Sequence, residues 1–383
     1  MDFYFSEEQK MIQQAAKDFA KAELLPSAIE RDEKQQFPYE QVKKMGQLGF
    51  LGMMVSPEYG GGGMDAVSYV LAMEEIAKVD ASAAVIMSVN NSLVCWGIEK
   101  FGTEEQKQKY LTKLATGEWL GAFCLSEPEA GSDATSQKTT AQDMGDYYLV
   151  NGTKNWITNG SSADVYLVMA QTDVSKKHNG VNTLIIEKNT PGFEIGPKEN
   201  KMGIRSSDTH SLQFNNVKVP KENRVGEDGF GFKFAMKTLA GGRIGIASQA
   251  LGIASGAYEL ALKYAQERKS FGKPIFEHQA IAFKLADIAV QIEAARILCL
   301  KAAWEKDNNI DYTLSSSMAK VFASEMCQFV TDEAIQIFGG MGLMDELPLE
   351  RMWRDTRVDR IWDGTSEIQR HIISRGLLRE FGG

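Results

Sequence analysis

The chain of 383 residues is long for a single hydrophobic core, so two or three packed modules are expected. Its composition, 43% hydrophobic and 24% charged, is typical of a soluble globular protein. The net charge of −9 and the lack of a basic block interleaved with aromatic residues argue against a nucleic-acid partner. The acidity is interpreted as an aid to solubility.

Other sequence features bear on location and on metal binding. No apolar run approaches the ~20 residues of a membrane span, and residues 1–7 lack the basic start and apolar core of a signal peptide. We therefore expect a cytoplasmic protein without a membrane span. The cysteines are far apart and the histidines dispersed, which predicts buried reduced thiols, no disulfide framework and no metal site. The cysteines are Cys95, Cys124, Cys299 and Cys327.

The predicted elements fall into three successive regions. Helical periodicity covers Ser6 to about Gly117, most clearly in the stretches 7–25, 39–48 and 66–78. Short strands follow, at 165–170, 183–187 and 211–219, and Asn151-Gly152 predicts a two-residue hairpin turn between strands at 147–150 and 153–158. Long helices are predicted at 243–268, 279–307, 314–338 and 366–378.

This order predicts an α+β fold with a helical domain at 1–118, a β domain at 119–228 and a helical bundle at 229–383. Strands and helices do not alternate as they do in a Rossmann sheet, and the Gly229-Phe230-Gly231 segment lacks the full glycine spacing of a dinucleotide loop. A nicotinamide dehydrogenase is therefore disfavoured.

A turn directly before the last predicted helix carries one acidic side chain, Asp363. Gly364 permits a tight turn, Thr365 or Ser366 can cap the first helical amides, and Ser366 with Gln369 has the capping-box spacing. The positive end of the helix favours a carboxylate or a phosphate, so the segment could serve a base, a pyrophosphate or both. An ordinary helix cap with a solvated carboxylate is the alternative.

Motifs over nearly the whole chain resemble those of the acyl-CoA dehydrogenase family, nearest to the short-chain, butyryl-CoA type. They are CLSEPEAGSD at 124–133, KNWITNG at 154–160, GGRIGIA at 241–247, ERKSFG at 267–272, QIFGG at 336–340 and the Asp363 segment. The resemblance implies an N-terminal helical domain, a middle β-barrel and a C-terminal four-helix bundle. It also implies one FAD per subunit and a homotetramer built as a dimer of dimers.

The resemblance assigns residues to the cofactor and the substrate, although each could singly be an ordinary core, cap or turn residue. The residues implied at the flavin ring are Phe123, Leu125, Ser126, Trp156, Ile157 and Thr158, with Ser132 near both the cofactor and the thioester. Those implied at the ADP end, bound mainly to a neighbouring subunit, are Arg268, Phe271, Gln279, Gln336, Gly339 and Gly340. The resemblance implies a further FAD contact at Thr365, Ser366 and Glu367. It implies contacts with the acyl-CoA substrate at Gly242, Arg243, Trp362 and Gly364.

The implied reaction is α,β-dehydrogenation of an acyl-CoA thioester, with a carboxylate removing the α-proton and the β-hydrogen passing as hydride to flavin N5. Electrons would then pass to an electron-transferring flavoprotein. The base of short- and medium-chain members is Glu, whereas this chain has Asp363. The other family location for the base falls at about Gly242, which has no carboxylate, so Asp363 is the one obvious candidate.

The shorter side chain leaves three hypotheses open. A dehydrogenase for α-branched or alicyclic substrates such as cyclohexanecarboxyl-CoA is slightly favoured, because the shorter base could make room for a ring. A short-chain, butyryl-CoA dehydrogenase is the second. The third is a flavin-binding homologue with little activity, and bleaching of the flavin by an acyl-CoA would exclude it.

Overall fold

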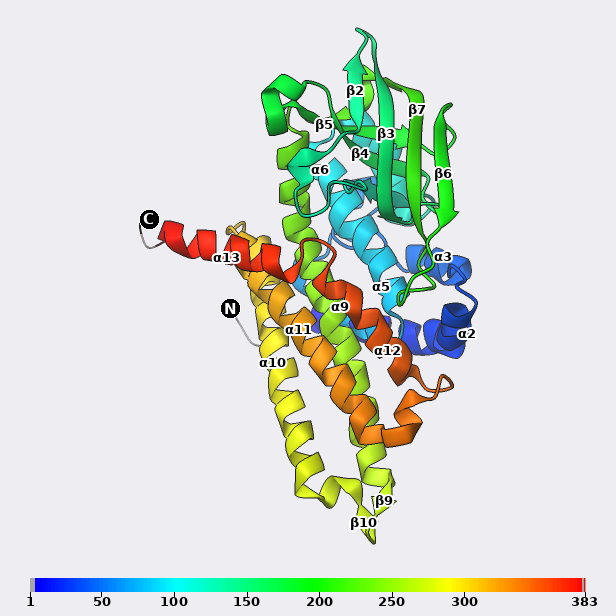
Figure 1. Cartoon of the computed structure of the whole chain (residues 1–383), viewed down its shortest axis with the longest axis vertical. Helices are drawn as coiled ribbons and strands as arrows, with labels where there is room; N and C mark the ends of the chain where they lie inside the picture. The colour runs from blue at the N-terminus through cyan, green and yellow to red at the C-terminus, as the bar shows by residue number, and fades with distance from the viewer. Residues whose placement is uncertain (1–3, 381, 383) are drawn as a thin grey trace.

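The structure is a computed structural model, and it describes residues 4–380 and 382. Helices occupy both ends of the chain and a β module lies between them in sequence (Figure 1), which confirms the predicted α+β order. The three domain boundaries stay predictions. Residues 1–3 of the segment considered as a signal peptide lie outside the described residues.

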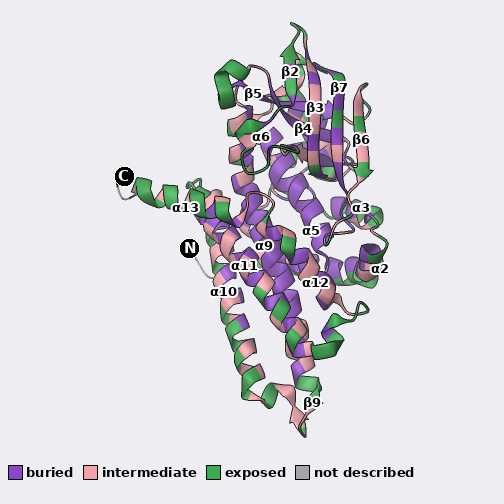
Figure 2. Ribbon diagram, in the orientation of Figure 1, coloured by how far each residue is buried: buried purple, intermediate pink, exposed green. Residues whose placement is uncertain are grey.

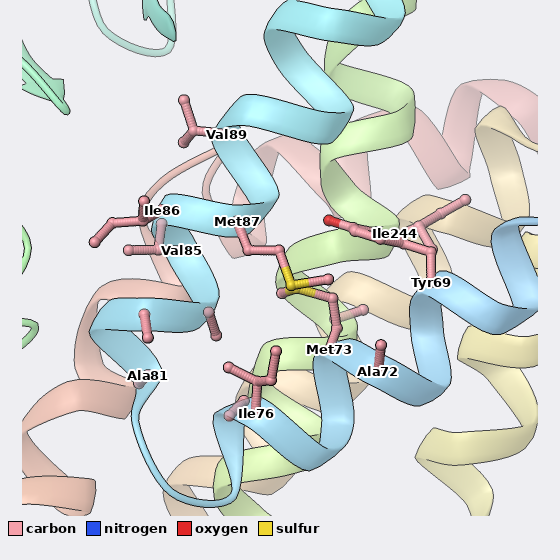
Figure 3. Close-up of a cluster of buried hydrophobic side chains, with 14 of the residues drawn as sticks. Tyr69, Ala72, Met73, Ile76, Ala81, Val85, Ile86, Met87, Val89 and Ile244 are labelled. Atoms are coloured by element: carbon pink, nitrogen blue, oxygen red, sulfur yellow. The ribbon is translucent and has the colours of Figure 1, made fainter. Parts of the chain in front are cut away.

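The N-terminal region is a set of short helices around a buried α4–η4 core. Its elements are α1 (Glu7–Phe19), η1 (Ala20–Leu24), η2 (Leu25–Ser27), α2 (Ala28–Glu33), α3 (Tyr39–Gln47), η3 (Pro57–Tyr59), α4 (Ala66–Ala77), α5 (Ala81–Ser88), η4 (Val89–Cys95), α6 (Trp96–Phe101), α7 (Glu104–Gln106), η5 (Lys107–Leu111) and α8 (Thr112–Thr116). Figure 3 shows Tyr69 and Met73 of α4 and Met87 of α5 gathered beside Ile244, a residue of the C-terminal region.

The consecutive elements α5, η4 and α6 form one apolar stretch, Ala81–Phe101, with a mean hydropathy of 1.4. By length and composition this stretch could cross a membrane, so the prediction that no such run exists is wrong. Two of its polar side chains bond inside the protein: the amide of Asn90 donates to the Leu51 carbonyl at 2.8 Å and that of Asn91 to the Phe50 carbonyl at 2.7 Å. In the 18-residue part of this stretch that has this hydropathy, 94% of the residues are buried, as in the core helix of a globular protein. The cytoplasmic location stays a prediction.

The middle region is an eight-stranded sheet with the order β6-β7-β3-β2-β4-β5-β8, and β1 pairs in parallel with β4. Its strands are β1 (Gly121–Cys124), β2 (Thr140–Asp143), β3 (Tyr147–Thr158), β4 (Val165–Gln171), β5 (Val181–Glu187), β6 (Phe193–Lys198), β7 (Thr209–Pro220) and β8 (Arg224–Val225). The short helices η6 (Ala134–Ser136), η7 (Val174–Gly180) and η8 (Lys221–Asn223) connect them. One face of the sheet holds a separate apolar core around Tyr148 and Phe214.

The predicted hairpin at Asn151-Gly152 is wrong, because β3 runs through both residues as one strand. Its pairing with β7 shifts register between Val150 and Gly152, which marks a bulge. Gly152 has φ +145, and a β-carbon there would lie 2.6 Å from the Thr139 hydroxyl. The glycine therefore allows a bulge and the close approach of Thr139, the residue before β2. The chain reverses between β2 and β3 earlier, at residues 144–146.

The C-terminal region is built on three long helices that pack along one another (Figure 1). Its elements are α9 (Gly231–Glu267), β9 (Lys269–Ser270), β10 (Lys273–Pro274), η9 (Ile275–Glu277), α10 (Gln279–Asp307), α11 (Thr313–Phe338), η10 (Gly339–Leu343), α12 (Pro348–Thr356), η11 (Arg357–Arg360) and α13 (Ser366–Glu380). Helix α9 begins at Gly231 rather than Arg243, and its central part is buried (Figure 2). The four cysteines are buried and free, as predicted.

Candidate active site

The Asp363 turn connects η11 to α13 and is held by three side-chain donors. Asp363 and Gly364 have positive φ angles of +51 and +93, so the turn reverses sharply at these two residues. The amide of Gln369 donates to the carbonyls of Asp363 (3.1 Å) and Gly364 (2.8 Å). Lys320 Nζ donates to the Gly364 carbonyl at 2.8 Å, and Arg243 Nε approaches the Asp363 carbonyl at 3.5 Å. Helices α9, α11 and α13 thus fix the position of the turn.

The start of α13 is capped by Thr365, whose hydroxyl accepts from the amide of Ile368 at 3.3 Å. The predicted capping box between Ser366 and Gln369 is wrong, because the Gln369 amide is used to hold the preceding turn. Within the described residues, the buried Ser366 hydroxyl has no hydrogen-bond partner. Glu367 is exposed, and the helix-start backbone amide lowers its pKa.

The carboxylate of Asp363 lies against helix α9 at Gly242. A β-carbon on Gly242 would lie 2.6 Å from Asp363 Oδ2 and 2.7 Å from Leu93 Cδ2, so only glycine leaves room for the carboxylate there. Leu93 belongs to η4, which places the acid between the N-terminal and C-terminal helices. Asp363 as a whole residue has intermediate exposure.

Burial raises the pKa of Asp363 to about 6, while the nearby cations Lys320 and Arg243 act to lower it. Burial also lowers the pKa of Lys320 to about 8 and that of Arg243 below its usual range. At neutral pH the Asp363 carboxylate is therefore mostly ionised, and it is a stronger proton acceptor than an exposed aspartate. This arrangement suits a general base.

A second group of predicted residues meets where β1 ends beside β3. The amide of Asn155 donates to the Ser126 carbonyl at 2.9 Å, and Lys154 Nζ donates to the Leu125 carbonyl at 3.0 Å. These two contacts bring the 123–126 and 156–158 segments together. Lys154 is fully buried and pairs with Glu127 at 2.8 Å.

Trp156 occupies a strained and exposed position in this group. It has φ +57, lies within a register shift of β3 against β7, and is 56% exposed. Backbone strain of this kind costs on the order of 1–3 kcal/mol and typically marks a ligand site. Ile157, by contrast, is buried in the core of the β module. Ser132 lies exposed in the loop between β1 and β2.

A third group lies at one end of the helical region, around β9 and β10. Arg268, Gln279 and Gln336 are exposed there, and Phe271 is 95% exposed with φ +51. The predicted Gly339 and Gly340 follow α11 at the same end, with open space around both. Stacked rings of Tyr264 and Phe338, 4.0 Å apart, join the ends of α9 and α11. Within one chain this end lies far from the β module (Figure 1), so the two groups do not meet.

Three family models together match most of the sequence. Residues 6–118 match "Acyl-CoA dehydrogenase, N-terminal domain", residues 122–217 match the middle domain, and residues 229–378 match the C-terminal domain. The chain belongs to the acyl-CoA dehydrogenase family. It is an FAD-dependent oxidoreductase of that family, as the sequence motifs predicted.

Relatives of this acyl-CoA dehydrogenase match it end to end. The short-chain specific acyl-CoA dehydrogenase of Mus musculus mitochondria is 49% identical over 98% of this chain and 91% of its own length. The solved butyryl-CoA dehydrogenase of Megasphaera elsdenii is 47% identical with a TM-score of 0.97, covering 99% of this chain and 100% of its own. A solved chain from work on the electron-transferring flavoprotein of Acidaminococcus fermentans is 48% identical with a TM-score of 0.98, with the same coverage.

The residues present fit an FAD. Trp156 and Phe271 expose large aromatic surfaces on strained backbone, which suits flat ring systems, and solved relatives with FAD are 31% identical with TM-scores of 0.95. The comparisons do not support the favoured alicyclic substrate, since the relatives named above are short-chain enzymes, and they fit the short-chain alternative better.

Sequence reasoning missed Lys320 as part of the site and gave Gln369 only a capping role. Lys320 interrupts a buried stripe of small residues on α11, among them Ser316, Ala319 and Ala323. A charged residue at helical spacing within such a stripe is the signal that could have found it, because buried lysines need a specific partner.

Proposed function

We propose that this acyl-CoA dehydrogenase oxidises a short, straight-chain acyl-CoA of the butyryl-CoA class to the trans-2-enoyl thioester, with Asp363 as the base. The observation that carries the proposal is the position of the Asp363 carboxylate against Gly242, where burial raises its pKa. The named short-chain relatives support the substrate class.

The role of each group follows from its chemistry. Asp363 accepts the α-proton, and its backbone amide is expected to donate to the thioester carbonyl, which makes that proton more acidic. Arg243 and Lys320 lie close to the base and limit the rise of its pKa. Bound FAD supplies the acceptor for the β-hydrogen. Trp156 would cover one face of the flavin, with Leu125 and Ser126 beside it.

Close packing next to the base supports a short acyl group. Leu93 touches the Gly242 position, and at Gly245, one helical turn further, a β-carbon would lie 2.7 Å from the Tyr69 hydroxyl. Tyr69 and Ile244 belong to the buried cluster in Figure 3, so α9 is closely packed at residues 244 and 245.

The substrate class is tested by mixing the purified protein anaerobically with straight, branched and cyclic acyl-CoA thioesters while following flavin absorbance. We expect butyryl-CoA to reduce the flavin fastest. Faster reduction by cyclohexanecarboxyl-CoA would restore the alicyclic hypothesis, and a flavin that no thioester bleaches would favour a homologue with little activity.

We further infer a homotetramer in which each FAD bridges two subunits. The separation of the Trp156 and Phe271 groups supports bridging, and helix α10 carries an exposed apolar stripe at seven-residue spacing that a second copy could cover. The stripe comprises Phe283, Val290 and Ile297, which are 60%, 70% and 40% exposed. Val290→Glu should lower the mass measured by light scattering, whereas an unchanged mass would exclude this face as an interface.

An electron-transferring flavoprotein is the proposed acceptor. The support is the similar chain solved in work on the electron-transferring flavoprotein of Acidaminococcus fermentans. Reoxidation of substrate-reduced enzyme by such a flavoprotein, measured anaerobically, tests the proposal, and failure of the reduced enzyme to transfer electrons would contradict it.

A further inference from the structure

A fully buried lysine lies directly beneath the candidate base. Lys320 has no exposed surface, and its ammonium group donates to the carbonyl of Gly364 at 2.8 Å. The other fully buried lysine of the site, Lys154, contacts a carboxylate directly, that of Glu127 at 2.8 Å. Lys320 instead contacts the backbone of the turn that carries Asp363.

The hydrogen bond alone does not explain why a lysine occupies this position. The Gly364 carbonyl already accepts from the amide of Gln369, also at 2.8 Å, so a neutral donor satisfies it. Burying an ammonium group is costly, and burial lowers the pKa of Lys320 to about 8. What Lys320 adds beyond Gln369 is a positive charge beside Asp363.

Four elements bring titratable groups to Lys320 and Asp363. These groups are Arg243 on α9, Tyr69 on α4, Asp359 on η11 and Glu367 on α13. Burial raises the pKa of Tyr69 to about 12 and that of Asp359 well above its usual range, so both favour their neutral forms. Glu367 is exposed to solvent, which screens its charge. The charges that most strongly affect the base are those of Lys320 and Arg243.

We propose that Lys320 is a positioning residue for the reaction, which fixes the Asp363 turn and favours the ionised form of its carboxylate. The inference rests on the proposed role of Asp363 as base. Gln369 and Lys320 both donate to the Gly364 carbonyl, but they contribute differently. Gln369 only holds the turn, whereas Lys320 holds the turn and also adds a positive charge.

The test uses acetyl-CoA, which has α-protons but no β-carbon and so cannot be dehydrogenated. Exchange of its α-protons in D₂O, followed by NMR on the FAD-loaded enzyme between pH 5 and 9, reports the base without hydride transfer. In Lys320→Met we expect the apparent pKa of exchange to rise by about one unit, because an opposite charge is lost. The plateau rate should fall about 10–100-fold as the turn loosens.

Two further variants separate charge from geometry. Gln369→Leu should lower the plateau without moving the apparent pKa, since no charge is removed. Lys201→Met is the matched control, because Lys201 also has a pKa of about 8 through burial but bonds the Ser207 carbonyl in the β module. Its exchange profile should equal that of the unaltered protein. FAD content and thermal midpoint are measured for every variant.

An apparent pKa of exchange in Lys320→Met within about 0.3 unit of that in Lys201→Met would overturn the inference. If Lys320→Met does not fold, Lys320→Gln removes the same charge with a polar side chain, and its pH profile decides in the same way. Asp363→Asn tests the role of the base separately from that of Lys320. If Asp363→Asn retains exchange, the proposed base itself is contradicted. If Asp363→Asn loses exchange but the pH profile of Lys320→Met is not shifted, only the role of Lys320 is contradicted.

Discussion

Asp363 reaches α9 although its side chain is one methylene shorter than the usual glutamate. The positive φ at Asp363 turns the backbone sharply, and the missing β-carbon of Gly242 lets the carboxylate lie against the helix. The two positions that the family resemblance implies for a base thus lie side by side in this chain, with Asp363 at one and Gly242 at the other. The observed position of the Asp363 carboxylate therefore requires a residue without a β-carbon at position 242.

The raised pKa of Asp363 predicts a pH-dependent effect on stability. The folded-state pKa is about 6 against an ordinary value of 3.8, so the ionised carboxylate destabilises the fold above pH 6, and this cost vanishes below about pH 4. Asp363→Asn should therefore stabilise the protein at pH 8 by about 1 kcal/mol, allowing for partial exposure, and have little effect at pH 4. Denaturant unfolding at the two pH values measures this, and equal effects at both would contradict the raised pKa.

At the scale of the element, α9 offers adjacent glycines with different surroundings. Gly242→Ala should slow flavin reduction about 10–100-fold, because the new β-carbon would collide with Asp363 Oδ2 and displace it. Gly241→Ala is the control, since the nearest atom to its β-carbon would be 3.7 Å away. It should keep its rate and gain about 0.5–1 kcal/mol of stability. Stopped-flow reduction with butyryl-CoA compares them, and equal rates would place the base elsewhere.

A buried ion pair joins Lys154 of β3 to Glu127, in the segment that follows β1. Lys154→Met should lower the free energy of unfolding by about 3–5 kcal/mol, because it leaves the Glu127 carboxylate buried without its cation. Lys218 is exposed, so Lys218→Met should change the free energy of unfolding by less than about 0.5 kcal/mol. Urea unfolding followed by circular dichroism measures both, and similar effects would mean that the pair contributes little.

The sequence predicted most long helices because their periodicity is strong. The predicted helix 279–307 has the bounds of α10. The predicted helix 243–268 begins 12 residues after the start of α9, because Gly241 and Gly242 interrupt the apolar pattern. The Asn151-Gly152 hairpin failed because a glycine that serves a bulge has the same local signal as one that serves a turn. The sequence could not identify the partner of Lys320, because that partner is a backbone carbonyl 44 residues away.

At the scale of the whole molecule, one chain holds the two expected parts of an FAD site at separate places. Arg268→Ala is predicted to weaken FAD retention and assembly together, because it removes a cation expected at the pyrophosphate of a cofactor shared between subunits. Lys269→Ala, at the neighbouring exposed position, is the control. Gel filtration with absorbance at a flavin wavelength reports both properties, and a stable FAD-loaded monomer would contradict a bridging cofactor.

The central claim is that Asp363 removes the α-proton of a bound acyl-CoA. The most direct measurement is anaerobic stopped-flow reduction of the flavin by butyryl-CoA in the unaltered protein and in Asp363→Asn, with FAD content and thioester binding measured in parallel. We expect Asp363→Asn to retain FAD and to bind the thioester, while reduction slows at least ~10²–10⁴-fold. Near-normal reduction by Asp363→Asn would contradict the claim.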